Sequence, residues 1–226
     1  MEDRKLKSKI LKAWENSFPQ LFPFAPNKLY KTIGPIIIGI ELIQIPKTII
    51  YRPYFVIYSL WKKNLKECLE YPIVNIVIEN KGIPIELTYT VIDERLNNTI
   101  EIVSEQIDVL LENNVKLYTI LNIVDKYLVT PIIGISTGSY LQARLYEFKY
   151  DLAVFLNNDD LINSVWGELI IISWDAQHFA LWGSSIDKWV NSLKEKLNNR
   201  KYLIDKVLEN KEDSKINKLK NSIIVL

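Results

Sequence analysis

The hydrophobic pattern of this 226-residue chain changes near residue 93. Before that point the apolar residues are mostly β-branched and form short extended runs separated by turn residues, at 36–45, 49–61, 73–78 and 83–90. Beyond it, apolar residues recur about every 3.6 positions, which is the period of an α-helix. Because the strands are grouped before the helices instead of alternating with them, the sequence predicts an α+β fold. Its sheet is predicted to be mainly antiparallel and four-stranded, at about residues 35–90.

Helices are predicted before and after this sheet. Residues 2–17 carry an apolar stripe at helical spacing and are followed by Pro19, which ends the predicted N-terminal helix. Three central helices are predicted from the apolar stripes in 96–110, 118–128 and 141–155.

The last third of the sequence predicts a second hairpin and a long helix. The β-branched run 165–174, the turn 175–177 and the segment 178–182 read as a hairpin at about 165–182. A long C-terminal helix follows, with an N-cap signal at Ser184–Ser185. We expect residues 1–210 to form a single α+β domain and residues 211–226 to form a polar, partly frayed tail.

The composition argues against several kinds of chemistry. The chain has one cysteine, Cys68, and one histidine, His178, so it can form neither an internal disulfide nor a cysteine-based or histidine-rich metal centre. The glycine-rich phosphate loop, the dinucleotide fingerprint and the metalloprotease motif are all missing from the sequence. We therefore expect no metal site and no cofactor.

Charge is balanced overall but uneven along the chain. The formal net charge is +1, which gives no basic field for a nucleic-acid partner. Residues 65–175 nevertheless hold 7 basic and 17 acidic side chains. We expect the central helices to present an acidic face to a basic protein partner, with these residues at its centre: Glu101, Glu105, Asp108 and Glu112. Alternatively, the basic ends of the chain fold back and neutralise this region.

The compartment is predicted from the absence of a signal peptide and of a long uninterrupted apolar segment. Residues 1–20 are too charged for a signal peptide, and the apolar stretch 33–61 is interrupted by Glu41, Lys47 and Arg52. No membrane span is predicted, and we expect a cytoplasmic location. A membrane-surface role for helix 2–17 and the connector 18–24 remains a further alternative. The abundance of Ile, Lys and Asn indicates an AT-rich genome, bacterial or phage.

One motif favours an enzyme instead. Gly134-Ile-Ser136-Thr-Gly138 matches the G-x-S-x-G pattern that exposes a nucleophilic serine between a strand and a helix. In a hydrolase His178 would be the base and Asp160 the acid, with Asp151 or Asp159 as substitutes. The structural interpretation is a glycine-containing loop capped by a hydroxyl, with His178 on a strand and binding backbone.

The sequence as a whole favours binding over catalysis. We expect a non-catalytic, soluble protein–protein binding module, such as a bacterial or phage immunity or accessory protein. The serine hydrolase built on Ser136 and His178 is the alternative. We also expect the tryptophan-rich segment 166–189 to pack in the core.

Overall fold

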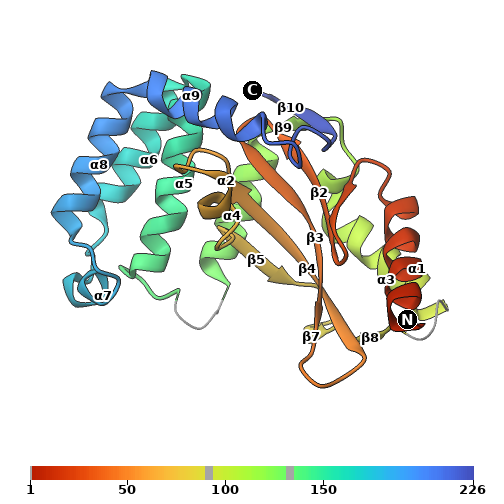
Figure 1. The fold of residues 1–226 in the computed structure, drawn as a ribbon. Coiled ribbons are helices and arrows are strands. Elements are labelled where there is room, and N and C mark those ends of the chain that lie inside the picture. Colours follow the sequence, from red (N-terminus) through yellow and green to blue (C-terminus); the bar gives the residue numbers. More distant parts are fainter. Residues whose placement is uncertain (1, 90–93, 131–134) are drawn as a thin grey trace.

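The computed structural model describes residues 2–89, 94–130 and 135–226, and their fold is α+β, as predicted. Figure 1 shows two parts: a twisted sheet with its covering helices, and a group of helices beside it. Within the described residues the main sheet has eight strands. Its central order is β5 (Val74–Val77), β4 (Ile50–Ser59), β3 (Ile36–Gln44), β2 (Lys28–Ile33), β10 (Asn221–Val225) and β9 (Asn114–Lys116).

The predicted four-stranded sheet at about 35–90 was therefore too small. Two short strands extend the main sheet further, since β1 (Phe22–Ala25) pairs with β2 and β8 (Leu87–Thr88) pairs with β4. The strands of the predicted region do pair antiparallel, as β3 and β4 do from Ile36 opposite Ser59 to Gln44 opposite Tyr51. Among the missed strands, β9 and β10 pair with distant segments, which local patterning does not reveal, whereas the six-residue β2 forms a hairpin with β3 and was not predicted.

The prediction of a frayed tail at 211–226 was wrong. Strand β10 lies between β2 and β9 and is parallel to both. Ile216 and Leu219, just before it, are buried against the sheet. Lysines and asparagines dominate the sequence there, but a few apolar residues at the right positions are enough to attach the segment.

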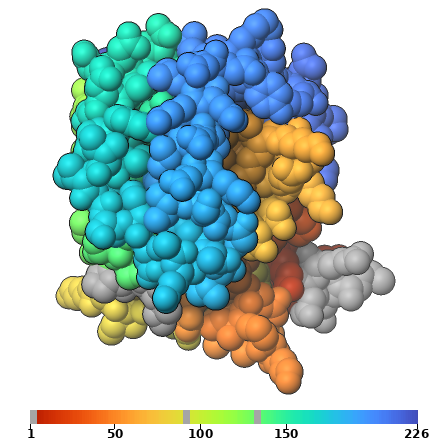
Figure 2. Space-filling view, turned by 90° about the vertical axis from the view of Figure 1, so that its left-hand side faces the viewer, coloured from red at the N-terminus to blue at the C-terminus, as the bar shows by residue number. Residues whose placement is uncertain are grey.

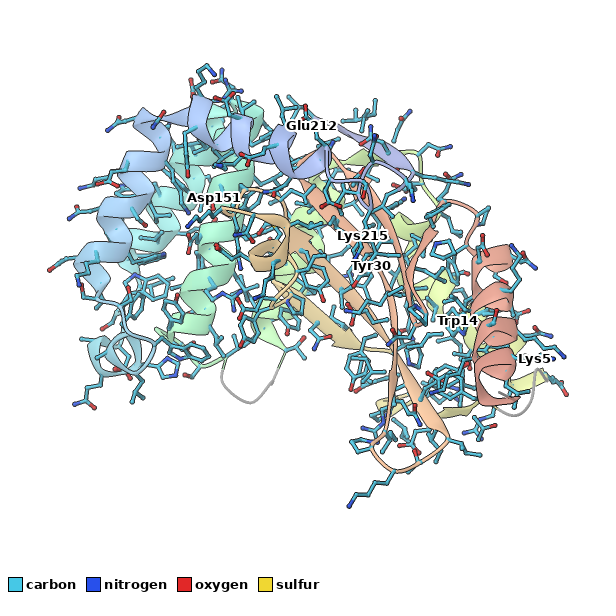
Figure 3. The ribbon with its side chains drawn as sticks, in the orientation of Figure 1. Lys5, Trp14, Tyr30, Asp151, Glu212 and Lys215 are labelled. Carbon is cyan, nitrogen blue, oxygen red and sulfur yellow. The ribbon has the colours of Figure 1, made fainter. Side chains whose placement is uncertain are left out.

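Both faces of the sheet are covered, which explains why β3 is apolar almost throughout. One face packs against α1 (Glu2–Ser17), α3 (Glu94–Gln106) and α4 (Leu117–Val129). The other face packs against α9 (Arg200–Lys211) and the residues that follow it. In Figure 3, Trp14 marks the first layer and Tyr30 belongs to the second.

Glu41 is the one acidic side chain in the middle of β3, and it is buried among partners. Its Oε1 accepts hydrogen bonds from the Tyr30 and Tyr58 hydroxyls, the second at 2.7 Å, and from Lys28 Nζ at 2.9 Å. Burial, followed by the nearby Glu41 charge, raises the pKa of Tyr30, so the phenol stays a donor. A buried carboxylate that accepts three donors is tolerated in a strand.

The second predicted hairpin, at about 165–182, was also wrong, because this segment is helical. It contains α6 (Asp159–Ile171) and α7 (Ala176–Leu181), which pack with α5 (Tyr140–Leu156) and α8 (Ile186–Asn198). Ile162, Val165 and Leu169 are the buried positions of α6, at helical spacing. A run of β-branched residues reads as a strand, yet this stripe and the Asn158 cap made it a helix.

The remaining predictions of local structure mostly hold. The predicted long C-terminal helix is broken at Asn199 into α8 and α9, with Ser185 as the N-cap of α8. Between the expected strands 73–78 and 83–90, the chain forms a small hairpin of β6 (Glu79–Asn80) and β7 (Ile83–Pro84). Two short elements complete the fold, α2 (Leu65–Cys68) and the 3₁₀ turn η1 (Asp108–Leu110). Among the described residues, none of the helices is long and apolar enough to cross a membrane.

Candidate ligand-binding cleft

A cleft of about 480 Å³ opens where the sheet meets the helical group. One wall is the chain from the end of β4 through α2, and the other is formed by α5, the end of α7 and α8. In Figure 2 the segment around residues 60–70 (light orange) borders α8 (blue). The lining residues are Ser59, Trp61, Lys62, Lys63, Glu67, Tyr71, Ile73, Tyr140, Arg144, Glu147, Phe148, Asp151, Trp182 and Lys196.

One face of α5 supplies most of the helical wall. Tyr140, Arg144, Glu147 and Asp151 follow one another at spacings of three or four residues, which places them on the same side of a helix. Figure 3 shows Asp151 on this helix. This cluster could have been found in the sequence, because charged residues at that spacing interrupt an otherwise apolar helix. We did not predict it.

Asp151 and Lys196 form a buried ion pair beside the cleft. Lys196 Nζ donates to Asp151 Oδ2 at 2.9 Å and also to Glu147. Burial raises the pKa of Asp151 above its ordinary value, and the Lys196 charge opposes this. For Lys196 burial lowers the pKa, but the two carboxylates outweigh it and the net shift is upward. Lys196 therefore stays positively charged. The free-energy cost of burying a charge falls on Asp151, whose pKa is raised.

Two buried oxygens at the cleft have no hydrogen-bond partner among the described residues. They are Asp151 Oδ1 and Ser59 Oγ, and both residues line the cleft, from opposite walls. A buried polar atom without a partner costs free energy, typically about 1–3 kcal/mol. Such atoms are uncommon in folded proteins, and two beside one cleft indicate a place where a ligand completes the hydrogen bonding.

Three cations that line the same cleft form no ion pair with the described residues: the exposed Lys63 and the half-buried Lys62 and Arg144. Burial, and then the nearby Arg144 guanidinium, lower the pKa of Lys62. The two charges therefore repel each other, and an anion between them would relieve both the repulsion and the desolvation.

The backbone at Lys62 is held in place from α9. Asn210 is buried, and its Nδ2 donates to the carbonyl oxygens of Leu60 and Lys62, both at 2.8 Å. These bonds fix the chain as it leaves β4, so Lys62 is presented from a rigid segment.

Aromatic side chains stand on both walls of the cleft. On the helical wall Trp182 stacks on Tyr140, with ring centroids 5.5 Å apart and planes 23° apart. On the sheet wall are Trp61, which contacts Phe148, and the exposed Tyr71. Trp182 is 52% exposed, so the expectation that the whole tryptophan-rich segment packs in the core fails for this residue.

In the alternative hydrolase, the serine and the acid Asp160 are separated, whereas His178 lies near the loop that holds Ser136. Ser136 is exposed in the loop before α5, Gly134 and the strand expected before the serine lie outside the described residues, and Asp160 is in the first turn of α6. Because α6 begins just after α5 ends, Ser136 and Asp160 are at opposite ends of a helix about 25 Å long.

His178 lies on α7, not on a strand as predicted, and its ring has a structural partner. Nδ1 accepts a hydrogen bond from the backbone N–H of Tyr140 at 2.9 Å, in the first turn of α5. That lone pair is therefore engaged in capping the first turn of α5. The imidazole binds backbone, as the structural interpretation of this residue expected.

Gly138 is required by packing between two loops. Its φ is +77°, and a Cβ at this position would lie 2.3 Å from the carbonyl oxygen of Ser173. The Gly138 carbonyl accepts from Asp175 N at 2.9 Å, which ties the start of α5 to the start of α7. This close approach accounts for the second glycine of the G-x-S-x-G match.

The predicted acidic residues do not all face outward. Glu101 and Glu105 are exposed on α3, and Asp108 is exposed on η1. Glu112 is half-buried, and its carbonyl oxygen accepts from the buried Lys31 Nζ at 2.6 Å. Burial lowers the pKa of Lys31 to about 8, and the Glu112 charge opposes this shift. The exposed acidic surface thus consists of Glu101, Glu105 and Asp108.

In the parts of the chain that the structure describes, no group of three or more histidine, cysteine, aspartate or glutamate side chains is placed to hold a metal ion. Comparisons of the chain with protein-family models, with curated proteins and with solved structures find no match.

Proposed function

We propose that this chain is a binding protein and that the cleft holds a small anionic molecule. The observation that carries the proposal is the pair of half-buried cations, Lys62 and Arg144, without counter-ions among the described residues. Lys196 does not compete for the anion, because Asp151 and Glu147 already neutralise it. Guanidinium and ammonium groups on opposite walls are a common means of holding a carboxylate or a phosphate.

Isothermal titration with inorganic phosphate, benzoate and adenosine 5′-monophosphate tests this proposal. We expect at least one of these anions to bind, and the double variant Lys62→Gln/Arg144→Gln to weaken that binding by about tenfold or more. Added salt should weaken it too, since the attraction is partly screened.

The matched control is Lys188→Gln/Lys218→Gln, which removes the same charge from exposed sites outside the cleft. It should bind as the wild type does. If all three anions fail to bind, or if both double variants lose affinity equally, the cleft is not an anion site.

A second candidate function is the docking of a basic protein on the acidic surface. The observation in its favour is that Glu101, Glu105 and Asp108 are exposed and form no ion pair with the described residues. Glu101→Lys/Glu105→Lys should abolish co-purification with such a partner from the native host, whereas Asp187→Lys/Glu195→Lys on α8 should not. Equal recovery with both variants would count against this surface.

The other expectations from the sequence stay predictions. They are the non-catalytic nature of the protein, its cytoplasmic location, its bacterial or phage origin and an immunity or accessory role.

A further inference from the structure

We propose that the anion is a nucleoside monophosphate, with its phosphate between Lys62 and Arg144 and its base against the aromatic side chains of the cleft. This inference rests on the proposed function and names the class of ligand. The features that carry it are the charge of the unpaired groups, the aromatic walls and the two unpartnered oxygens.

The charge of the site fits a phosphate monoester better than a carboxylate. A phosphate monoester carries about −1.5 to −2 charge at neutral pH, whereas a carboxylate carries −1. Three cations on the cleft, Lys62, Lys63 and Arg144, form no ion pair with the residues that the structure describes, whereas Lys196 is paired. A dianion between the two half-buried ones, Lys62 and Arg144, is balanced by them, and Arg144 can offer two parallel N–H donors to adjacent phosphate oxygens.

The aromatic side chains on the cleft walls can stack on a flat ring. Trp61 and Trp182 line the cleft from opposite sides, and Tyr140 already stacks behind Trp182. Stacking of a base on an aromatic side chain contributes about 1–3 kcal/mol per base and is largely independent of which base is present. The cleft volume of about 480 Å³ lies within the range of small-molecule sites and exceeds what a bare phosphate needs.

The unpartnered oxygens require hydrogen-bonding groups on the ligand. Asp151 Oδ1 needs a donor, and Ser59 Oγ can both donate and accept. A ribose hydroxyl or an exocyclic amine supplies such groups in addition to the phosphate, whereas an aromatic carboxylate lacks a donor. A nucleoside monophosphate therefore meets all three requirements together.

Titrations with separate parts of the ligand test the inference. The probes are adenosine 5′-monophosphate, uridine 5′-monophosphate, adenosine, inorganic phosphate, benzoate and a short 5′-phosphorylated oligoribonucleotide. We expect both monophosphates to bind at least tenfold more tightly than adenosine, phosphate or benzoate. Uridine and adenosine monophosphates should differ by less than tenfold, because stacking tolerates either base.

Single variants then separate the two halves of the site. Arg144→Gln should weaken the binding of monophosphates and of inorganic phosphate alike. Trp182→Leu should weaken the monophosphates by about fivefold or more and leave inorganic phosphate unchanged. Tyr118→Leu removes an exposed ring on α4, outside the cleft, and should change neither. Ser59→Ala, a small change that we expect to fold, should weaken the monophosphates selectively.

The outcomes distinguish this inference from the proposed function. If phosphate or benzoate binds as tightly as the monophosphates, the nucleotide assignment is overturned and the anion site stands. If the oligoribonucleotide binds more tightly than either monophosphate, the ligand is a nucleic-acid end and not a free nucleotide. If none of the probes binds, both the inference and the proposed function are rejected.

Discussion

Asp151 is the residue whose chemistry and surroundings conflict most. It is fully buried, one oxygen binds Lys196, and the other has no hydrogen-bond partner in the part of the chain that the structure describes. A neutral carboxyl group would be less costly in this position than a charged one, because burial penalises the charge. The contribution of Asp151 to the free energy of unfolding should therefore depend on pH.

The sign follows from the two pKa values. An aspartate in an unfolded chain has a pKa of about 3.9, and burial raises the pKa of Asp151 in the folded protein to about 7. The folded state binds this proton more tightly than the unfolded state, so the contribution is fully present below about pH 4 and is lost as the pH rises to about 7. Asp151→Asn, which imitates the neutral form, should remove this dependence. The variant should gain stability relative to the wild type as the pH rises.

Urea unfolding of both proteins between about pH 5 and pH 8 measures the effect, with a change of up to about 1.4 kcal/mol per pH unit. Asp187→Asn, at an exposed position in the first turn of α8, is the control and should follow the wild-type profile. Parallel profiles for the wild type and Asp151→Asn would show that the folded carboxyl keeps its ordinary affinity for protons.

The surroundings of some single residues could be predicted from the sequence, and those of others could not. The hydrogen bond from backbone to His178 could be foreseen, because a lone histidine flanked by apolar residues more often binds backbone. The cleft could not be foreseen, because Lys62 and Arg144 are far apart in the sequence and meet only through the packing of α5 beside the end of β4. The exposure of Trp182 could not be foreseen either, because it depends on where α7 ends.

At the scale of elements, β10 shows how little sequence is needed to complete a sheet. Its five residues lie between two other strands, β2 and β9, and join the last strand of the sheet order to the rest. Ile224 packs against the core cluster, close to Gly34, whereas the neighbouring Ile223 is 55% exposed. The two isoleucines therefore provide a matched pair.

Ile224→Asp should lower the free energy of unfolding by about 2–3 kcal/mol, because it places a charge where an apolar side chain is packed. Ile223→Asp makes the same chemical change on the exposed face and should cost less than about 1 kcal/mol. Chemical denaturation of the three proteins gives the comparison. Equal losses would mean that β10 is not seated on the core through Ile224.

Elements with a helical period were predicted well, and those defined by distant pairing were not. The central helices α3, α4 and α5 follow from their apolar stripes. Helix α6 was mistaken for a strand, because β-branched residues at its C-terminal end obscured the buried stripe at Ile162, Val165 and Leu169. β10 was missed, because its partners are about 110 and 190 residues earlier in the chain.

At the scale of the whole molecule, α5 joins the two parts. Leu145, Phe148 and Leu152 belong to the same buried cluster as the sheet, while Tyr150 and Val154 belong to the cluster of the helical group. Because α5 contributes side chains to both clusters, unfolding of one cluster disturbs the packing of the other. We therefore expect the sheet, including β10, and the helical group to unfold as one cooperative unit.

Urea unfolding followed by far-ultraviolet circular dichroism and by tryptophan fluorescence should give coincident transitions. Phe148→Ala should shift both curves together, by about 3–5 kcal/mol, since it removes a large buried ring from α5. Tyr118→Ala, at an exposed position on α4, should leave both nearly unchanged. Two separate transitions, or a shift seen by one probe alone, would show that the parts are independent domains.

The position of β10 also has a consequence for biosynthesis. Until residues 221–225 have emerged from the ribosome, the edges of β2 and β9 that they will occupy carry unpaired N–H and C=O groups. A nascent chain in this state resembles an unfinished sheet and can accept a strand from another copy. Slow translation late in the message would lengthen this exposure. We therefore expect the newly made chain to depend on chaperones more than its native stability suggests.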